Sequence, residues 1–115
     1  MADNKKKGNL GEKLASDYLE KIGYEIIKTN YRIRNAEIDI IAKINGITVF
    51  IEVKTRTDDS FGVPSEAVTQ KKREKYYRVS EEYLLRFASL DTPCRFDVIE
   101  IENGQINHIE DAFCM

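Results

Sequence analysis

Residues 37–54, EIDIIAKINGITVFIEVK, carry the strongest structural signal in this chain. Apolar residues recur on both sides of Asn45-Gly46, and an Asn-Gly pair between two such runs is the strongest short-range signal for a two-residue β-hairpin turn. With these two residues as the loop, Ile44 pairs with Ile47, and each further step pairs the next residue on either side. The stretch therefore predicts two antiparallel strands in a defined register.

This register places Asp39 directly opposite Glu52. It also places Glu37 opposite Lys54 on the same face, because side chains alternate between the two faces of a strand. Two carboxylates opposed across a ladder, with Cβ atoms about 5 Å apart, repel each other, and a divalent cation is the natural compensator. A three-residue loop with a bulge is the alternative, and it would shift the pairing by one residue. The opposite face is wholly apolar and consists of Ile38, Ile40, Ala42, Ile44, Ile47, Val49, Ile51 and Val53.

Length and composition exclude several classes of protein. A chain of 115 residues with 42% hydrophobic and 33% charged residues is typical of one soluble globular domain. Apolar runs stay well short of the ~18 residues of a membrane span, so we expect a cytoplasmic protein with no membrane partner. A single histidine, two cysteines and the lack of a CxxC pair exclude a zinc site of the usual kind and disfavour a disulfide framework.

The hydrophobic spacing predicts an α/β domain with the element order α-β-β-β-α-β-β and a mixed sheet flanked by helices. We expect residues 1–8 to be a disordered tail and residues 9–115 to form one domain. The first helix is expected to begin at Asn9, which caps it, and to end at Gly23. The other expected elements are strands over residues 24–33, 94–102 and 105–109, a polar loop over 55–63, a short turn over 64–68, and a second helix from Thr69 to about Ala88.

Glu52-Val53-Lys54 places a carboxylate and an amine side by side on one strand. Mg²⁺ binds one or two carboxylates together with waters and phosphate oxygens, so Asp39 and Glu52 are candidate ligands, with the Val53 backbone carbonyl as a third. Such a metal acidifies a bound water and stabilises charge on the phosphate, and Lys54 would orient or activate that water. The alternative is a solvated face with ordinary cross-strand ion pairs, and Glu37 is assigned to such a pair with Lys54.

These residues resemble the D-x(n)-ExK motif of the PD-(D/E)xK, or restriction-endonuclease-like, nucleases, whose common core is α-β-β-β-α-β. The chain is more closely similar to the YraN-like family of small bacterial proteins, which resemble archaeal Holliday junction resolvases. One departure from the nuclease pattern is that Ile38, and not proline, precedes Asp39. The similarity covers roughly residues 8–113, and its motifs are Gly11-Glu12, Asn30, Arg32, Glu37-Ile38-Asp39, residues 50–56, Phe61-Gly62, Lys72, residues 95–98 and Ala112-Phe113.

The resemblance implies a nuclease-like protein that hydrolyses phosphodiester bonds with Mg²⁺ or Mn²⁺. Asp39, Glu52 and Lys54 would then be catalytic residues, and Glu12 of the first helix would assist them as a further metal ligand. Structured or branched DNA is the expected substrate, DNA is favoured over RNA, and a homodimer is expected for a junction-type substrate. The alternatives on the same fold are a non-catalytic nucleic-acid-binding module and a protein-interaction subunit.

The charge distribution favours a local rather than a global nucleic-acid site. The net charge is −2, yet residues 69–78 carry five positive charges against one negative charge. A basic stripe of this kind binds phosphates, although a solvated helix face is an equally good interpretation. The expected phosphate contacts are Lys71, Lys72, Arg73 and Arg56. His108 is expected on the surface of the last strand, and Arg95 and Asp97 are expected to be structural.

Overall fold

The computed structural model describes the backbone of residues 2–56 and 70–113, and the side chains of residues 10–55 and 70–113. The turn that the sequence predicts after Pro64, the Thr69 helix cap and most of the polar loop fall within residues 57–69. These predictions therefore lie outside the described residues.

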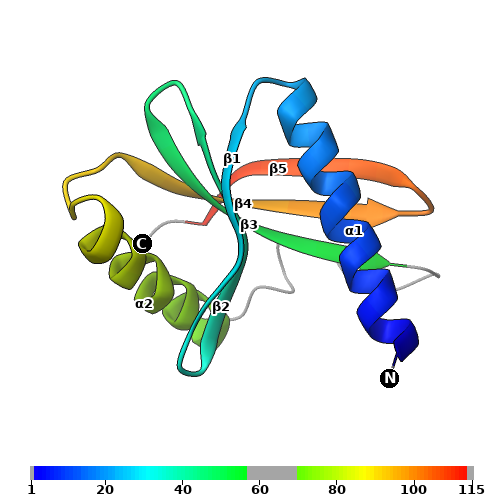
Figure 1. Ribbon diagram of the computed structural model, residues 1–115, viewed down its shortest axis with the longest axis horizontal. Helices are drawn as coiled ribbons and strands as arrows, with labels where there is room; N and C mark the ends of the chain where they lie inside the picture. The colour runs from blue at the N-terminus through cyan, green and yellow to red at the C-terminus, as the bar shows by residue number, and fades with distance from the viewer. Residues whose placement is uncertain (1, 57–69, 114–115) are drawn as a thin grey trace.

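The elements follow in the predicted order (Figure 1). They form an α/β protein with a mixed five-stranded sheet in the order β1-β2-β3-β4-β5. Strands β3 and β4 are parallel and are connected through α2, whereas the other neighbouring pairs are antiparallel. The elements are α1 (Ala2–Lys21), β1 (Glu25–Ile33), β2 (Ala36–Ile44), β3 (Ile47–Arg56), α2 (Gln70–Phe87), β4 (Cys94–Glu102) and β5 (Gln105–Phe113).

Helix α1 begins earlier than the sequence predicts. It already includes residues 2–8, which the sequence predicts as a disordered tail, so the expected start at Asn9 is wrong. Lysine and alanine are good helix formers, and a glycine inside a helix costs only about 1 kcal/mol relative to alanine, so Gly8 does not end the helix. The predicted end is confirmed, because the helix stops at Lys21 and Gly23 has a φ of 102°, which glycine adopts readily.

The predicted hairpin turn is confirmed. Asn45 and Gly46 have φ values of 51° and 78°, as a two-residue hairpin turn with two left-handed residues requires. Ile44 pairs with Ile47, and the predicted register continues to the pair of Ile40 with Ile51, which excludes the three-residue loop. The expected pairs of Asp39 with Glu52 and of Glu37 with Lys54 lie just beyond this paired segment.

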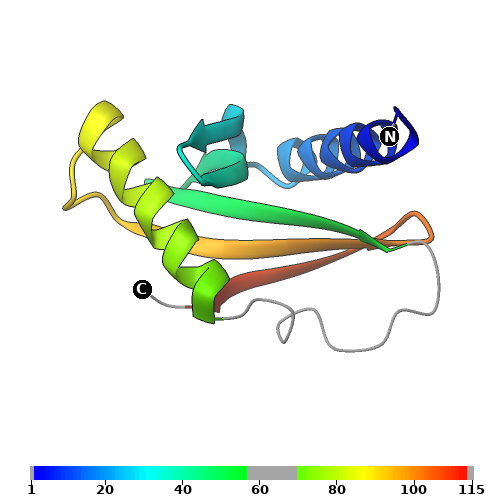
Figure 2. The ribbon, with the colours of Figure 1, turned by 90° about the horizontal axis from the view of Figure 1, so that it is seen from below.

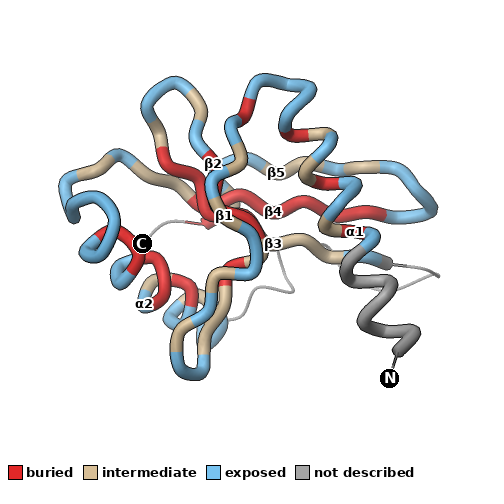
Figure 3. Tube along the Cα trace, viewed as in Figure 1, coloured by how far each residue is buried: buried red, intermediate tan, exposed pale blue. Residues whose placement is uncertain are grey.

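Two apolar clusters cover the two faces of the sheet. One cluster packs against α1 and the other against α2. The two helices lie near opposite ends of the sheet (Figure 2). Buried residues accordingly concentrate in the central strands and on the inner side of α2 (Figure 3). The α1 cluster contains Ala15, Leu19, Tyr24, Ile40, Ala42, Val49, Ile51, Ile99 and Ile101, and the α2 cluster contains Ile38, Ile41, Phe50, Tyr76, Val79, Tyr83, Leu84, Phe96, Val98 and Phe113.

The predicted apolar face of the hairpin is confirmed with one exception. The α1 cluster takes up every residue of that face apart from Ile38. Ile38 instead packs in the α2 cluster with Ile41 and Phe50. The strict alternation of faces along β2 therefore breaks between Ile38 and Ile40, at the position of Asp39.

Candidate metal centre

Strand β2 separates from β3 at Asp39. In a regular continuation of the ladder, the backbone N–H of Val53 would face Ile38. It donates instead to Oδ2 of Asp39, at 2.8 Å, while Ile38 stays paired with Tyr31 of β1. The Asp39 carboxylate thus enters the opening between the two strands. Because Ile38 is released from β3, its side chain is free to join the α2 cluster.

The surroundings of Asp39 disfavour its charged form. Burial is the largest cause that raises the pKa of Asp39, and the carboxylates of Glu52, Glu12 and Glu37 raise it as well. The hydrogen bond from Val53 opposes them, and together these causes bring the pKa to about 7. A divalent cation would reverse the balance, since it favours the ionised form of every carboxylate around it.

Glu52 supplies the second carboxylate, from β3. The hydroxyl of Tyr76, on α2, is hydrogen-bonded to this carboxylate, and burial together with Glu52 raises the pKa of Tyr76 so that the phenol remains a donor. The Oε2 atom of Glu52 is buried and has no hydrogen-bond partner among the described residues. A buried carboxylate oxygen without a partner is costly, and a bound cation would remove this cost.

Helix α1 brings Glu12 to the same end of the sheet. At Gly11 the helix approaches β3 so closely that a Cβ atom there would lie 2.3 Å from Oγ1 of Thr55. The next residue, Glu12, accepts a hydrogen bond from the side-chain amide of Asn30 in β1, at 3.4 Å. Its carboxylate is also one of the charges that raise the pKa of Asp39. Packing at a glycine therefore positions the helix carboxylate.

The donor atoms fit a hard cation in their chemistry, but they are not yet gathered around one point. Within residues 10–55 and 70–113, no group of three His, Cys, Asp or Glu side chains is arranged to hold a metal ion. One oxygen of Asp39 is engaged by Val53, and the Glu52 carboxylate by Tyr76. Carboxylate oxygens are nevertheless the ligands that Mg²⁺ and Mn²⁺ prefer, so small side-chain rotations would have to complete the site.

Lys54 lies on β3 two residues after Glu52 and is half-buried. Its neighbour in the parallel register of β3 and β4 is Glu100, a carboxylate that is only 6% exposed. Sequence reasoning missed Glu100, although a single acid in the run Val98-Ile99-Glu100-Ile101 was a usable signal. The position becomes informative only when β4 is known to lie parallel to β3 and level with Lys54.

Glu37 has a partner that the sequence did not predict. Its carboxylate is hydrogen-bonded and ion-paired with the guanidinium of Arg32. The two residues face each other across the β1–β2 ladder, on the opposite side of β2 from Lys54. Asp39, Glu52 and Glu12 form an acidic group at this end of the sheet, and Glu37 lies at its edge. Glu37 is in an ion pair as expected, but its partner is Arg32 and not the predicted Lys54.

The comparison with known proteins identifies the family. A model of "Uncharacterised protein family UPF0102" matches residues 11–101. The chain belongs to this family. The UPF0102 protein of Alkaliphilus oremlandii is 52% identical, over 96% of this chain and 99% of the relative. That of Clostridioides difficile is 46% identical over the same shares, and that of Symbiobacterium thermophilum is 47% identical over 84% of this chain and 82% of the relative. The YraN-like resemblance is thereby confirmed.

The basic residues of this UPF0102 protein do not share one face of α2. Lys71 and Lys72 are exposed, whereas the Arg73 guanidinium lies over the ring of Phe113, 5.5 Å from its centre. Arg56 ends β3, and its side chain lies outside the described residues. The four expected phosphate contacts thus remain predictions, and Arg73 is the one whose side chain turns toward the core. No helix in the described parts of the UPF0102 chain is both long and apolar enough to cross a membrane.

A second polar cluster lies on the α1 side of the sheet. The side chain of Asp97 is fully buried. It is ion-paired with Arg95, at 3.0 Å, and hydrogen-bonded with His108, whose Nε2 lies 2.8 Å from Oδ2. Nδ1 of His108 lies 3.1 Å from the hydroxyl of Tyr18 on α1. The expected surface position of His108 is therefore wrong, because its side chain is only 6% exposed. The expected structural role of Arg95 and Asp97 agrees with these contacts, which join α1 to β4 and β5.

Proposed function

We propose that this UPF0102 protein is a metal-dependent nuclease that hydrolyses phosphodiester bonds, with structured or branched DNA as its expected substrate. The observation that carries the proposal is the pair of Asp39 and Glu52 beside Lys54. Folding alone does not explain two half-buried carboxylates at this position, one of which has a pKa that burial and neighbouring carboxylates raise to about 7. The element order, which is also that of the restriction-endonuclease-like core, supports the same proposal.

The residues of the chain have distinct roles in this proposal. Asp39 and Glu52 would hold Mg²⁺ or Mn²⁺, with the Val53 carbonyl and Glu12 as further ligands. The bound ion would neutralise charge on the phosphate and acidify a water. Tyr76 holds the Glu52 carboxylate in place through its hydroxyl. Lys54 would orient the attacking water and donate to the negative charge that develops on the phosphate.

The chemistry requires no further co-reactant. The oxygen of the water forms a bond to phosphorus, and the bond from phosphorus to the leaving oxygen breaks. One proton of the attacking water passes to the surrounding water, and the leaving oxygen takes up a proton from the surrounding water to become a hydroxyl. Hydrolysis involves no oxidation or reduction, so the bound ion with its carboxylate ligands, Lys54 and water would suffice.

A non-catalytic nucleic-acid-binding module is the second candidate. Two observations favour this candidate. The described carboxylates do not converge on one point, and the pKa of Asp39 lies near 7, so this carboxyl is partly protonated at neutral pH. In such a module the acidic end of the sheet would have no metal and no chemistry. Nucleic-acid binding would then persist without any stabilisation by Mn²⁺.

Cleavage assays with matched variants test the nuclease proposal. Labelled four-way-junction, duplex and single-stranded DNA, and single-stranded RNA, are incubated with Mg²⁺ or Mn²⁺. We expect cleavage by the native chain, and a loss of about 100-fold or more in Asp39→Asn and Glu52→Gln. Glu110→Gln is the matched control, because it makes the same chemical change at an exposed carboxylate of β5 that pairs with Arg95. Cleavage that survives in both Asp39→Asn and Glu52→Gln would show that the activity does not come from this site.

A further inference from the structure

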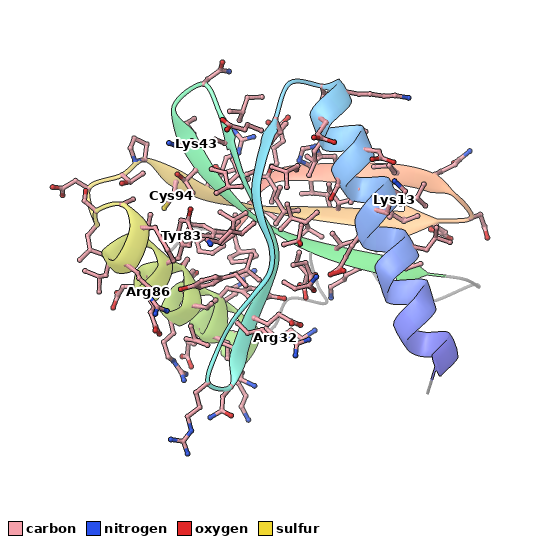
Figure 4. The ribbon with its side chains drawn as sticks, in the orientation of Figure 1. Lys13, Arg32, Lys43, Tyr83, Arg86 and Cys94 are labelled. Carbon is pink, nitrogen blue, oxygen red and sulfur yellow. The ribbon has the colours of Figure 1, made fainter. Side chains whose placement is uncertain are left out.

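A groove lies between the β1–β2 turn and the first turns of α2. Its volume is about 530 Å³, and its lining includes Arg32, Ile33 and Glu37 from the hairpin and Lys72, Lys75 and Tyr76 from the helix. Figure 1 shows the β1–β2 turn beside the start of α2, and Figure 4 shows Arg32 close to that turn. Two elements far apart in the sequence thus form one concave surface.

The groove is a basic feature of an acidic protein. Arg32, Lys72 and Lys75 contribute three positive charges to its lining, against the single carboxylate of Glu37. That carboxylate is already engaged by Arg32, whereas the whole chain has a net charge of −2. The lining therefore favours a phosphate-bearing ligand over a neutral or cationic one.

The groove is also contiguous with the acidic group. Tyr76 lines the groove, and its hydroxyl is hydrogen-bonded to Glu52. Glu37 lines the groove as well, and it lies two residues before Asp39 on β2. A phosphate chain in the groove would consequently lie next to the two carboxylates that we propose as metal ligands.

We infer that this groove binds the phosphates of one unpaired nucleic-acid strand and directs that strand to Asp39 and Glu52. The inference rests on the proposed nuclease function and specifies its substrate. A volume of about 530 Å³ is that of a small-ligand site and suits a short length of one strand rather than a whole duplex. Tyr76 is only 7% exposed, so it offers no free ring for base stacking. Contacts to phosphate and sugar carry no sequence information, so recognition is of a flap, gap or branch of any sequence.

The test compares two exposed lysines. Lys75 lines the groove, whereas Lys43 lies near the β2–β3 turn and is not part of the lining. Binding of a short fluorescein-labelled oligothymidylate is followed by fluorescence anisotropy over a series of KCl concentrations, with EDTA present so that no cleavage occurs. Lys75→Gln and Lys43→Gln remove the same charge by the same substitution, and circular dichroism verifies that both variants fold.

We expect the Lys75→Gln variant to bind the oligonucleotide several-fold more weakly than the native chain. The slope of log Kd against log salt should also fall by about 0.7, the value for one lost phosphate contact on a single strand. Lys43→Gln should leave both the Kd and the slope unchanged within error. A labelled blunt duplex of the same length should bind more weakly than the oligothymidylate.

Three results would overturn the inference. They are the absence of binding by the native chain, equal losses in the two lysine variants, and tighter binding of the duplex than of the single strand. Because the binding assay contains no metal, its outcome is independent of cleavage. Groove-specific binding without cleavage in Mg²⁺ or Mn²⁺ would refute the nuclease function alone. Cleavage without a difference between Lys75→Gln and Lys43→Gln would refute the groove alone.

Discussion

The carboxylate of Asp39 accepts a hydrogen bond from the backbone N–H of Val53, 2.8 Å away. A side chain of β2 thus takes the place that a backbone carbonyl would occupy in a regular ladder. The same hydrogen bond ties Asp39 to the strand that carries Glu52 and Lys54. The protonation state of Asp39, the separation of the two strands and metal binding are consequently expected to depend on one another.

The metal-free protein should lose stability as the pH rises through about 7. Burial is the main cause that raises the pKa of Asp39 from 3.8 to about 7 in the folded state. Between these values the folded protein retains a proton that the unfolded chain has released, so the free energy of unfolding falls as the pH rises. The effect of this one group is roughly 2–4 kcal/mol. Urea denaturation at pH 5 and pH 8 measures it.

The Asp39→Asn variant isolates this contribution, because its side-chain amide does not titrate. Its free energy of unfolding should vary less between pH 5 and pH 8 than that of the native chain. Glu37→Gln should retain most of the native pH dependence. Identical pH dependence in the native chain and Asp39→Asn would show that Asp39 titrates near its ordinary value.

Mn²⁺ should stabilise the native chain against heat at pH 8 and should fail to stabilise Asp39→Asn or Glu52→Gln. A ligand at about 100 times its Kd adds about 2.7 kcal/mol to the free energy of unfolding. Below pH 7, binding should also release a proton, because Asp39 must ionise to become a ligand. Differential scanning fluorimetry and calorimetry in two buffers measure the two effects. An equal shift of the melting temperature in all three proteins would place the metal elsewhere.

Replacement of Lys54 should separate chemistry from metal binding. We expect Lys54→Met to reduce the cleavage rate by about 100- to 1,000-fold, the usual loss for one donor to developing charge. The stabilisation by Mn²⁺ should remain, since methionine leaves the carboxylate ligands in place. Lys54→Arg should not restore the rate, because a planar guanidinium does not occupy the position of an ammonium group. A Lys54→Met variant with native activity would remove Lys54 from the mechanism.

Gly11→Ala should destabilise the native chain, although alanine is the better helix former. The added Cβ would lie 2.3 Å from Oγ1 of Thr55, and such overpacking costs about 1–3 kcal/mol. In a Thr55→Ala background that oxygen is absent, so the gain in helix propensity of about 1 kcal/mol should appear instead. Chemical denaturation of the four proteins of this double-mutant cycle measures both changes. The same sign in the two backgrounds would contradict the close approach of α1 to β3.

The buried Asp97 should matter far more to stability than the exposed Glu110, although both carboxylates pair with Arg95. Burial raises the pKa of Asp97, but hydrogen bonds from His108, the Asp111 N–H and Arg95 outweigh it and lower the pKa below 3.8. Asp97→Asn removes the negative charge that faces Arg95 and His108 in the interior. This change should lower the free energy of unfolding by about 3–5 kcal/mol.

Glu110 provides the matched comparison, because its side chain is 63% exposed. Glu110→Gln should therefore cost no more than about 1 kcal/mol. The contribution of Asp97 should also disappear as the pH falls below 3.8, because the lowered pKa makes protonation in the folded state unfavourable. Similar losses in the two variants, measured by urea denaturation at pH 7, would contradict a buried ion pair.

The hairpin shows how far local sequence information reaches. Asn45-Gly46 determines a two-residue turn, and the turn determines the register of the next residues, so the pairs from Ile44–Ile47 to Ile40–Ile51 were predictable. Helix α2 and strand β4 were predictable for the same reason, since the periodicity of their apolar residues is a local property. The acidic positions Asp39 and Glu52 follow from the same register.

The failed predictions depend on packing between distant segments. The side chain of Ile38 changes faces because Asp39 bonds to Val53, which no periodicity predicts. His108 is buried because β5 lies against α1, where Tyr18 and Asp97 meet its two ring nitrogens. Glu100 comes level with Lys54 only because β4 pairs parallel to β3.

Turn chemistry and side-chain alternation act over a few residues, so the order of the elements, the hairpin and two carboxylates next to a lysine could be predicted from the sequence. The folded chain alone shows that β2 separates from β3 at Asp39, that Gly11 lets Glu12 approach, and that α2 and the β1–β2 turn line a basic groove. Close packing and burial set these positions, and both depend on which distant residues become neighbours.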